Sequence, residues 1–224
     1  MRLVAVYARR HEPQWLVDDL RRNIGWADRI VEVDDRDRPA DQAWGHEGTM
    51  RALQRQRAIE AGADWVLVMD PDERLEDRAR TAIPELVRRL QRGPYVVQLR
   101  LRELFEPTRY RVDGRWGNLW RGRLYPVRPD SVMSDKPIHT PPCPVNPDYR
   151  RVRADINLYH LKMIEPANRP ARAAAYASAE AQHGHPGRAW GGLTRTRGMV
   201  LQQVPQARRF SPPHTRPYLI GGPE

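Results

Sequence analysis

The feature that most constrains this chain is an unbroken apolar run, Trp65–Met69, which ends abruptly in the carboxylates of Asp70, Asp72 and Glu73. The run is short and partly β-branched, which is typical of a fully buried strand. Clustered carboxylates repel one another unless a positive charge offsets them, and their oxygens suit hard cations. Ligands of open α/β sheets bind at the carboxyl ends of strands. The pattern therefore predicts a divalent-metal site (Mn2+ or Mg2+), with a plain Asp-Pro-Asp turn as the simpler alternative.

Predicted strands and helices alternate around this run. Strands are expected over residues 2–8, 29–33, 65–69 and 95–101, and helices over 13–24, 49–61 and 84–92, with a loop over 36–48. Such alternation favours an α/β fold with a mainly parallel sheet covered by helices on both faces.

The second half of the chain has a different texture. Residues 102–128 combine arginine with aromatics and predict irregular strands or a hairpin, whereas five prolines exclude regular structure over 137–148. A short strand over 156–161 and an alanine-rich helix over 167–182, beginning near Pro170, are expected to follow. We therefore predict one domain over 1–183, with halves 1–101 and 102–183. The Pro-, Gly- and Arg-rich tail, 184–224, is expected either to extend over the domain or to be partly disordered.

The charge of the chain predicts a polyanionic partner. The formal net charge is +10, and of the 38 basic residues only Lys136 and Lys162 are lysines. Arginine grips phosphate in a bidentate way, which favours nucleic acid, nucleotide, phospholipid or acidic glycan. The alternative is the compositional bias of an arginine-rich proteome.

The single cysteine, Cys143, excludes an intrachain disulfide and a cysteine-based zinc site. It fits a reducing compartment. The sequence has no apolar window as long as a membrane span and no signal-peptide pattern, so the expected localisation is cytoplasmic.

Residues 2–101 resemble the family 2 glycosyltransferases of the GT-A fold. The likeness rests on the strand that ends in Asp34 and Asp35, and on the later strand Trp65–Met69 with its Asp-Pro-Asp-Glu turn. It is weaker over residues 102–176, which look like the acceptor half, and it does not cover the tail. The resemblance implies a GT-A sheet and metal-dependent transfer of a sugar from a nucleotide-sugar, a UDP-sugar first, to a hydroxyl acceptor.

The resemblance also implies roles for the residues of the donor half. Asp34 or Asp35 would contact the nucleotide, and Asp70 would lie near the ribose and the metal. Arg9 and Glu12 lie in the loop that lines the nucleotide base in this family.

Metal and diphosphate contacts follow in the same way. Asp72 would ligate the metal on the donor diphosphate, and His160 matches the late histidine of the fold. A metal held by these two residues would neutralise the charge that develops on the leaving diphosphate. Arg121, Arg123 and Lys162 are candidates for further diphosphate contacts. The alternative for His160 is a satisfied histidine on a half-buried strand.

The catalytic base is less clearly indicated. An inverting enzyme needs a group to take the proton of the acceptor hydroxyl. Some relatives carry His-Glu after a short apolar segment, whereas here His139 is followed by threonine. The expected base is Asp135 first and His139 second, unless the reaction proceeds with retention. The other interpretation of Asp135 is a loop acid paired with Lys136 or a nearby arginine.

Three acceptor classes remain open: a lipid-linked or envelope glycan, a protein or small molecule, and a hydroxylated base in DNA. Arginines interleaved with Trp116 and Trp120 could hold a phosphate backbone and stack an extruded base, which favours DNA.

Rival functions are a haloacid-dehalogenase-like phosphatase, a nucleotidyltransferase and a non-catalytic nucleic-acid-binding protein. The first usually has Thr or Val where Arg74 stands and opens the chain with its acidic motif. The second needs a glycine-rich phosphate loop after the first strand, and the third leaves the acidic strand end unexplained.

Overall fold

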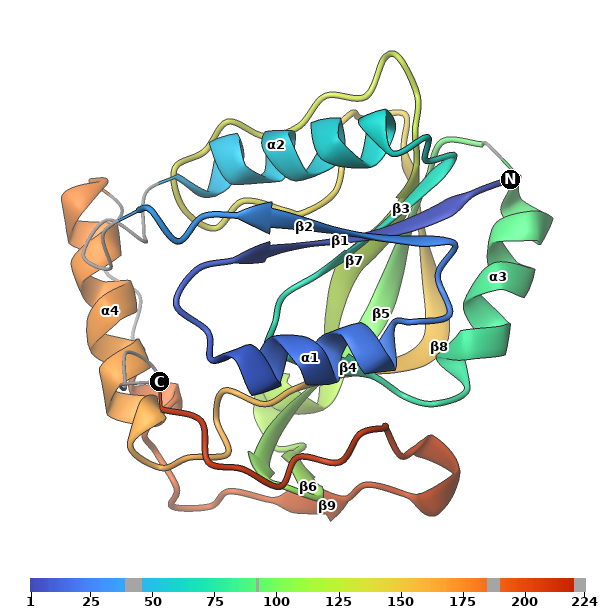
Figure 1. Ribbon diagram of the computed structural model, residues 1–224. Coiled ribbons are helices and arrows are strands. Elements are labelled where there is room, and N and C mark those ends of the chain that lie inside the picture. Colours follow the sequence, from blue (N-terminus) through green and yellow to red (C-terminus); the bar gives the residue numbers. More distant parts are fainter. Residues whose placement is uncertain (39–45, 92, 185–189, 220–224) are drawn as a thin grey trace.

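The computed structural model describes residues 1–38, 46–91, 93–184 and 190–219, which form a mixed sheet flanked by helices (Figure 1). The strands are β1 (Leu3–Arg9), β2 (Arg29–Asp34), β3 (Trp65–Met69), β4 (Glu73–Leu75), β5 (Tyr95–Glu106), β6 (Arg109–Arg111), β7 (Leu119–Pro126), β8 (Arg150–His160) and β9 (Leu201–Gln203). The helices are α1 (Gln14–Asn23), α2 (Glu47–Glu60), α3 (Ala79–Leu90) and α4 (Asn168–Gln182), with 3-10 turns at Gly114–Asn118, Trp190–Gly192 and Gln206–Arg208. Most of the predicted loop 36–48 lies outside the described residues.

The sheet has the strand order β2-β1-β3-β7-β5-β6-β9, and β8 pairs with β5 and β4. β1 is parallel to β2 and β3, and β5 is parallel to β8. β7 lies between β3 and β5 and is antiparallel to both. The predicted α/β architecture is therefore present, but the sheet is mixed rather than mainly parallel. The cause is that β7, from the segment rich in arginine and aromatics, lies between β3 and β5 and is antiparallel to both.

The central strands are buried on both faces. Ala5 and Tyr7 of β1 pack in one apolar cluster with α1 and α3, while Val4 and Val6 pack in another with α2. Every residue of β3 is buried. Figure 1 shows α1 and α2 on opposite sides of β1 and β2, as this alternation requires. The apolar run thus predicted a doubly covered central strand correctly.

Two predicted boundaries are wrong for physical reasons. α3 begins at Ala79, not at Pro84, so the proline lies inside the helix and leaves one intrahelical hydrogen bond unmade. β8 spans Arg150–His160 instead of 156–161. The exposed side chains of Arg150, Arg151 and Arg153 hid this part of the strand, although the backbone there pairs with β5. The hairpin expected within 102–128 is present as β5 and β6.

The tail extends over the domain. β9 pairs with β6, and the backbone continues along the lower edge of the molecule in Figure 1. Phe210 and Tyr218 are buried in a cluster with Leu16 and Tyr159. The described part of the tail is therefore anchored to the domain through this shared apolar cluster.

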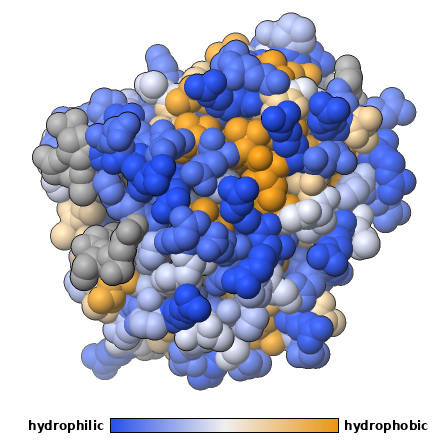
Figure 2. Space-filling model, in the orientation of Figure 1, coloured by the Kyte–Doolittle hydropathy of each residue, from blue (hydrophilic) through white to orange (hydrophobic). Residues whose placement is uncertain are grey.

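The visible surface is mostly hydrophilic; its most extensive apolar area lies near the position of β2, and smaller apolar spots lie elsewhere (Figure 2). Within the described residues, no helix has both the length and the apolar character needed to cross a membrane.

Candidate active site

A cavity of about 640 Å3 lies where β1 and β3 end. Its walls come from the turn after β3, from β5 and β7, from the end of β8, from α4 and from the proline-rich loop 139–146. The cavity thus brings together the acidic turn of the first half of the chain and the basic and aromatic residues of the second half.

The acidic turn is neutralised by arginines. Asp70 accepts hydrogen bonds from both terminal nitrogens of Arg51 at 3.1 Å, and from Arg123 at 2.9 Å. Arg123 also forms an ion pair with the buried carboxylate of Glu73. Burial raises the pKa of Asp70, but the two guanidinium groups outweigh it and hold the pKa below its usual value. The repulsion inferred from the sequence is therefore offset here by side chains of α2 and β7.

The same turn is fixed from beneath by a buried arginine. Arg74 of β4 is 1% exposed and donates to the carbonyl oxygens of Pro71 at 2.8 Å and Leu16 at 2.9 Å. Because the Arg74 guanidinium binds the carbonyl oxygens of Pro71 and Leu16, it holds the turn that carries Asp72 against α1.

Asp72 is the centre of a buried charge cluster. Its Oδ2 lies 2.9 Å from Nζ of Lys162 and 3.1 Å from Nε2 of His160. The other ring nitrogen of His160, Nδ1, lies 2.8 Å from Oε2 of Glu103. Burial opposes all these charges, but the mutual pairing lowers the pKa of Asp72 well below its usual range and raises that of His160 to about 10. Without a ligand, the cluster is thus internally paired.

The donor set of Asp72 and His160 fits a divalent ion. Oδ2 of Asp72 and Nε2 of His160 lie 3.1 Å apart, a hydrogen-bond distance, so an ion held by both would replace the proton between them. Glu103 stands where a carboxylate commonly orients a metal-bound histidine. In the described part of the chain, no three His, Cys, Asp or Glu side chains are grouped to hold a metal.

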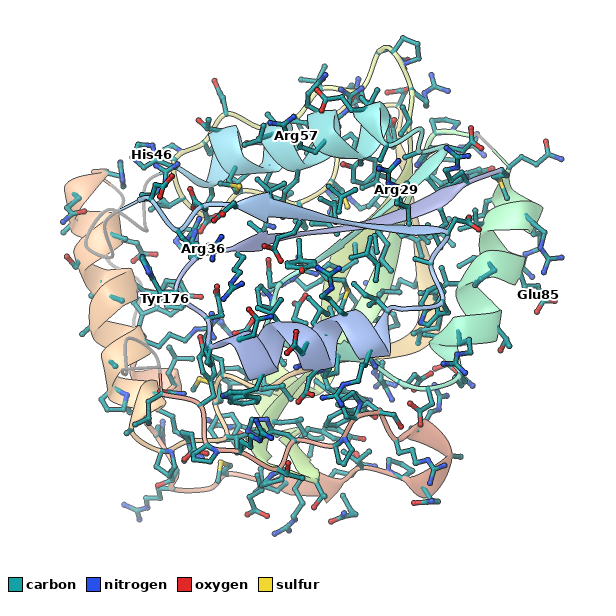
Figure 3. All side chains as sticks on the ribbon, in the orientation of Figure 1. Arg29, Arg36, His46, Arg57, Glu85 and Tyr176 are labelled. Atoms are coloured by element: carbon teal, nitrogen blue, oxygen red, sulfur yellow. The ribbon has the colours of Figure 1, made fainter. Side chains whose placement is uncertain are left out.

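One face of α4 carries three polar side chains at intervals of four residues: Arg172, Tyr176 and Glu180. Arg172 Nη2 donates to the Tyr176 hydroxyl at 2.7 Å, and its Nη1 lies 3.5 Å from Nε2 of His160. Residues four apart lie on the same side of a helix, and in Figure 3 Tyr176 lies on the side of α4 toward the strands. Helix α4 therefore connects the Asp72 cluster with a second group of side chains.

That second group is aromatic and centres on a buried carboxylate. Glu180 is 1% exposed, and its two oxygens lie 2.9 Å from Nε2 of His139 and 3.0 Å from Nε1 of Trp190. The Tyr176 and Trp190 rings stack with centroids 4.4 Å apart, and the His139 and Trp190 rings at 5.9 Å. Tyr176, His139 and Trp190 all line the cavity.

The cavity contains some of the predicted donor residues and not others. Glu12 and Asp70 line it, and burial raises the pKa of Glu12. Arg9, Asp34 and Asp35 are not among the lining residues.

Asp34 and Asp35, which lie outside the cavity, each form an ion pair with a nearby arginine. Arg10 lines the cavity in place of Arg9 and donates from Nε to Asp35 at 2.8 Å. Asp34 pairs with Arg36 at the surface. Asp35 thus contacts the cavity wall through Arg10.

The predicted diphosphate and acceptor residues all line the cavity. They are Arg121, Arg123, Lys162, Trp116 and Trp120. Arg123 and Lys162 are committed to the acidic turn, as described above. Arg121 is exposed, and its hydrogen bond is to the carbonyl oxygen of Trp120 at 3.3 Å. The Trp120 ring packs against the guanidinium of Arg153 at 5.0 Å. The two base candidates are separated: His139 lines the cavity, whereas Asp135 is exposed and does not.

Sequence reasoning missed five side chains of this site: Arg51, Glu103, Arg172, Tyr176 and Glu180. The regular spacing of the last three on a predicted helix was a visible signal. Glu103 gave none, because it lies beyond the predicted end of its strand.

Of three comparisons with known proteins, only the search of solved structures found a match. No family model matches the chain, and no curated protein matches it. Among solved structures, the crystal structure of S. aureus TarS, a glycosyltransferase, overlaps with a TM-score of 0.44 and 9% sequence identity. The overlap covers 86% of this chain and 41% of the TarS chain, so this chain spans less than half the length of that neighbour. A TM-score of 0.44 carries no argument about function.

Proposed function

We propose that this chain is a glycosyltransferase that moves a sugar from a nucleotide-sugar to a hydroxyl acceptor. The observation that supports the proposal most is the buried Asp72 carboxylate, paired with His160 and Lys162 in a cavity at the ends of β1 and β3. A carboxylate and an imidazole beside several cations suit a diphosphate and its metal ion.

In this proposal the site stabilises the leaving diphosphate. Asp72 and His160 would hold a divalent ion, Mn2+ or Mg2+, which supplies Lewis-acid charge stabilisation when bound. Once a ligand competes for Asp72, Lys162 can turn its ammonium group toward the phosphate oxygens. Arg172, held by Tyr176 beside His160, adds a second fixed cation. Charges preorganised in this way lower the barrier because they need no reorganisation during the reaction.

The nucleotide would lie toward β1. Arg10 and Glu12 line that side of the cavity, and Asp35 holds the Arg10 guanidinium in place. In this proposal Asp34 and Asp35 act at the rim or through arginine, and UDP is the first nucleotide to test.

We favour a polyanionic acceptor, with DNA carrying a hydroxymethylated base as the first candidate. Arg115, Arg121 and Arg151 line the cavity, and within the described residues none of them has a carboxylate partner. Unpaired arginines beside Trp116 and Trp120 suit a phosphate backbone and a base stacked on an aromatic ring. The same chemistry on an envelope or lipid-linked glycan is the alternative.

A transfer assay tests the function. The purified chain is incubated with UDP-, GDP- and dTDP-sugars, Mn2+, and either hydroxymethylcytosine DNA, unmodified DNA or an oligosaccharide acceptor. We expect nucleoside diphosphate release with one donor and a labelled acceptor. Asp72→Asn is expected to lower the rate by about a hundredfold or more, whereas Asp18→Asn, on the exposed side of α1, leaves it unchanged. Absence of diphosphate release from every donor, with every acceptor, would refute the proposal.

A further inference from the structure

We propose that His139, oriented by the buried carboxylate of Glu180, is the general base that takes the proton of the acceptor hydroxyl. This inference rests on the proposed glycosyltransferase function. It assigns the base to a pair of residues that lie 41 positions apart in the sequence.

The loop that carries His139 is pinned to the N-terminus of α2. The backbone N–H groups of Glu47 and Gly48 donate to the carbonyl oxygens of Pro137 and Lys136, both at 3.0 Å. In return, the Glu47 carboxylate accepts a hydrogen bond from the backbone N–H of Thr140 at 2.8 Å. These contacts bracket His139 on both sides and fix its place in the cavity wall.

His139 itself has a backbone conformation that is costly for a residue other than glycine. Its φ is +57°, in the left-handed region. Such strain persists only where the surroundings over-determine the conformation, and it concentrates at functional sites. His139 lines the cavity, and its side chain is 28% exposed.

Glu180 fixes the orientation of the imidazole. The carboxylate is 1% exposed and accepts from Nε2 of His139 and from Nε1 of Trp190. With both oxygens engaged, it cannot rotate freely. A carboxylate that accepts from one ring nitrogen holds the proton of the neutral imidazole there, which makes the other nitrogen, Nδ1, the basic one. Glu180 of α4 thus provides a carboxylate beside His139, although the residue that follows His139 in the sequence is a threonine.

The alternative base does not reach the cavity. Asp135 is exposed, and its backbone packs so closely on α2 that a Cβ added at Gly48 would lie 2.6 Å from the Asp135 carbonyl carbon. His139, in contrast, shares one cavity with Asp72 and contacts Tyr176, which binds the Arg172 guanidinium.

The proposed step is balanced in atoms and charge. The acceptor oxygen forms a bond to the anomeric carbon of the sugar, and its proton moves to Nδ1 of His139. The bond between the anomeric carbon and the diphosphate oxygen breaks, and its electron pair leaves with the diphosphate. Glu180 keeps its charge and stabilises the imidazolium that forms. A single displacement of this kind inverts the configuration at the anomeric carbon.

Kinetics of matched variants test the pair. His139→Ala is expected to lower kcat for transfer by about a hundredfold or more, with the affinity for UDP and Mn2+, measured by calorimetry, unchanged. Added imidazole should restore part of the rate, which a purely structural role would not allow. Glu180→Gln should lower kcat by about tenfold or more at unchanged KM for the donor, and Glu180→Asp should recover part of that loss. Glu85→Gln, on α3 far from Tyr176 in Figure 3, is the control.

An NMR measurement tests the orientation without requiring turnover. In the neutral form, long-range 1H–15N spectra should show the His139 proton on Nε2 in the wild type and a mixture of tautomers in Glu180→Gln. Neutral His139 protonated on Nδ1 in the wild type would overturn the assignment of Nδ1 as the base.

The kinetic outcomes separate the two proposals. If the wild type releases no diphosphate from any donor, the proposed function fails and the base assignment falls with it. If the wild type is active and His139→Ala keeps its kcat, only the base assignment is overturned. If His139→Ala is slow and Glu180→Gln is as fast as the wild type, the positioning role of Glu180 is wrong.

Discussion

Replacing Asp72 with asparagine should destabilise the protein, although the residue lies at a candidate active site. Asn keeps the shape of the side chain and removes the charge that pairs with Lys162 and His160. Breaking a fully buried ion pair costs about 3–5 kcal/mol. Because the Lys162 side chain is 24% exposed and lines the cavity, water screens part of the loss, and we expect about 1–3 kcal/mol. For a chain of this size that corresponds to a fall in Tm of about 3–10 °C.

The assay is thermal and urea unfolding at neutral pH, with Asp18→Asn as an exposed control expected to change stability by less than about 0.5 kcal/mol. Saturating UDP with Mn2+ should raise the stability of the wild type, by about 2.7 kcal/mol at a hundredfold excess over Kd, and should leave Asp72→Asn almost unchanged. The opposing effect is repulsion from the nearby carboxylates of Asp70 and Glu103. An Asp72→Asn protein more stable than the wild type would show that this repulsion exceeds the pairing and would refute the reasoning.

Three further predictions follow from the same structure. Gly48→Ala should displace the loop that carries His139, because the added Cβ would lie 2.6 Å from a backbone atom of Asp135. The rate of transfer should fall with little change in the affinity for UDP. An unchanged rate would contradict the tight contact. Phe210→Ala should lower the free energy of unfolding by about 2–4 kcal/mol, because the ring is buried against the domain, whereas Leu219→Ala, which is 52% exposed, should have little effect in the same urea titration. Chelation by EDTA should abolish transfer and weaken UDP binding, both restored by Mn2+; equal rates with and without EDTA would count against metal binding by Asp72 and His160.

The part of the site predicted from the sequence is the part encoded by contiguous residues. A buried apolar run followed by Asp70 and Asp72 is a local pattern, and in the structure the two carboxylates follow the central strand and line a cavity. His160 was identified through its position in a likeness to a known family, and it lies 3.1 Å from Asp72. Short-range patterns and a family resemblance thus indicated the centre of the candidate site.

The remaining residues of the site are brought together by contacts between distant segments, which no local sequence pattern indicates. The position of β7 between β3 and β5 brings Arg123 to the acidic turn, and nothing local to Arg123 indicates that register. The first residues of β8 were missed because exposed arginines conceal the alternation of a strand. The four-residue spacing placed Glu180 on one face of a predicted helix, but no local pattern indicated that its partner is His139, 41 positions away.

Because Arg172, Tyr176 and Glu180 lie on one helix, α4 fixes the distance between the two parts of the proposed site. Eight residues of α-helix measure about 12 Å along the axis, so α4 sets the separation between Arg172, beside the proposed site of the leaving group, and Glu180, beside the proposed base. Lengthening the helix by one residue between them would turn the two ends out of alignment by about 100°. A change in the loop that carries His139 would leave the surroundings of Arg172 intact. A change in the number of residues between Arg172 and Glu180 would displace both side chains from their partners.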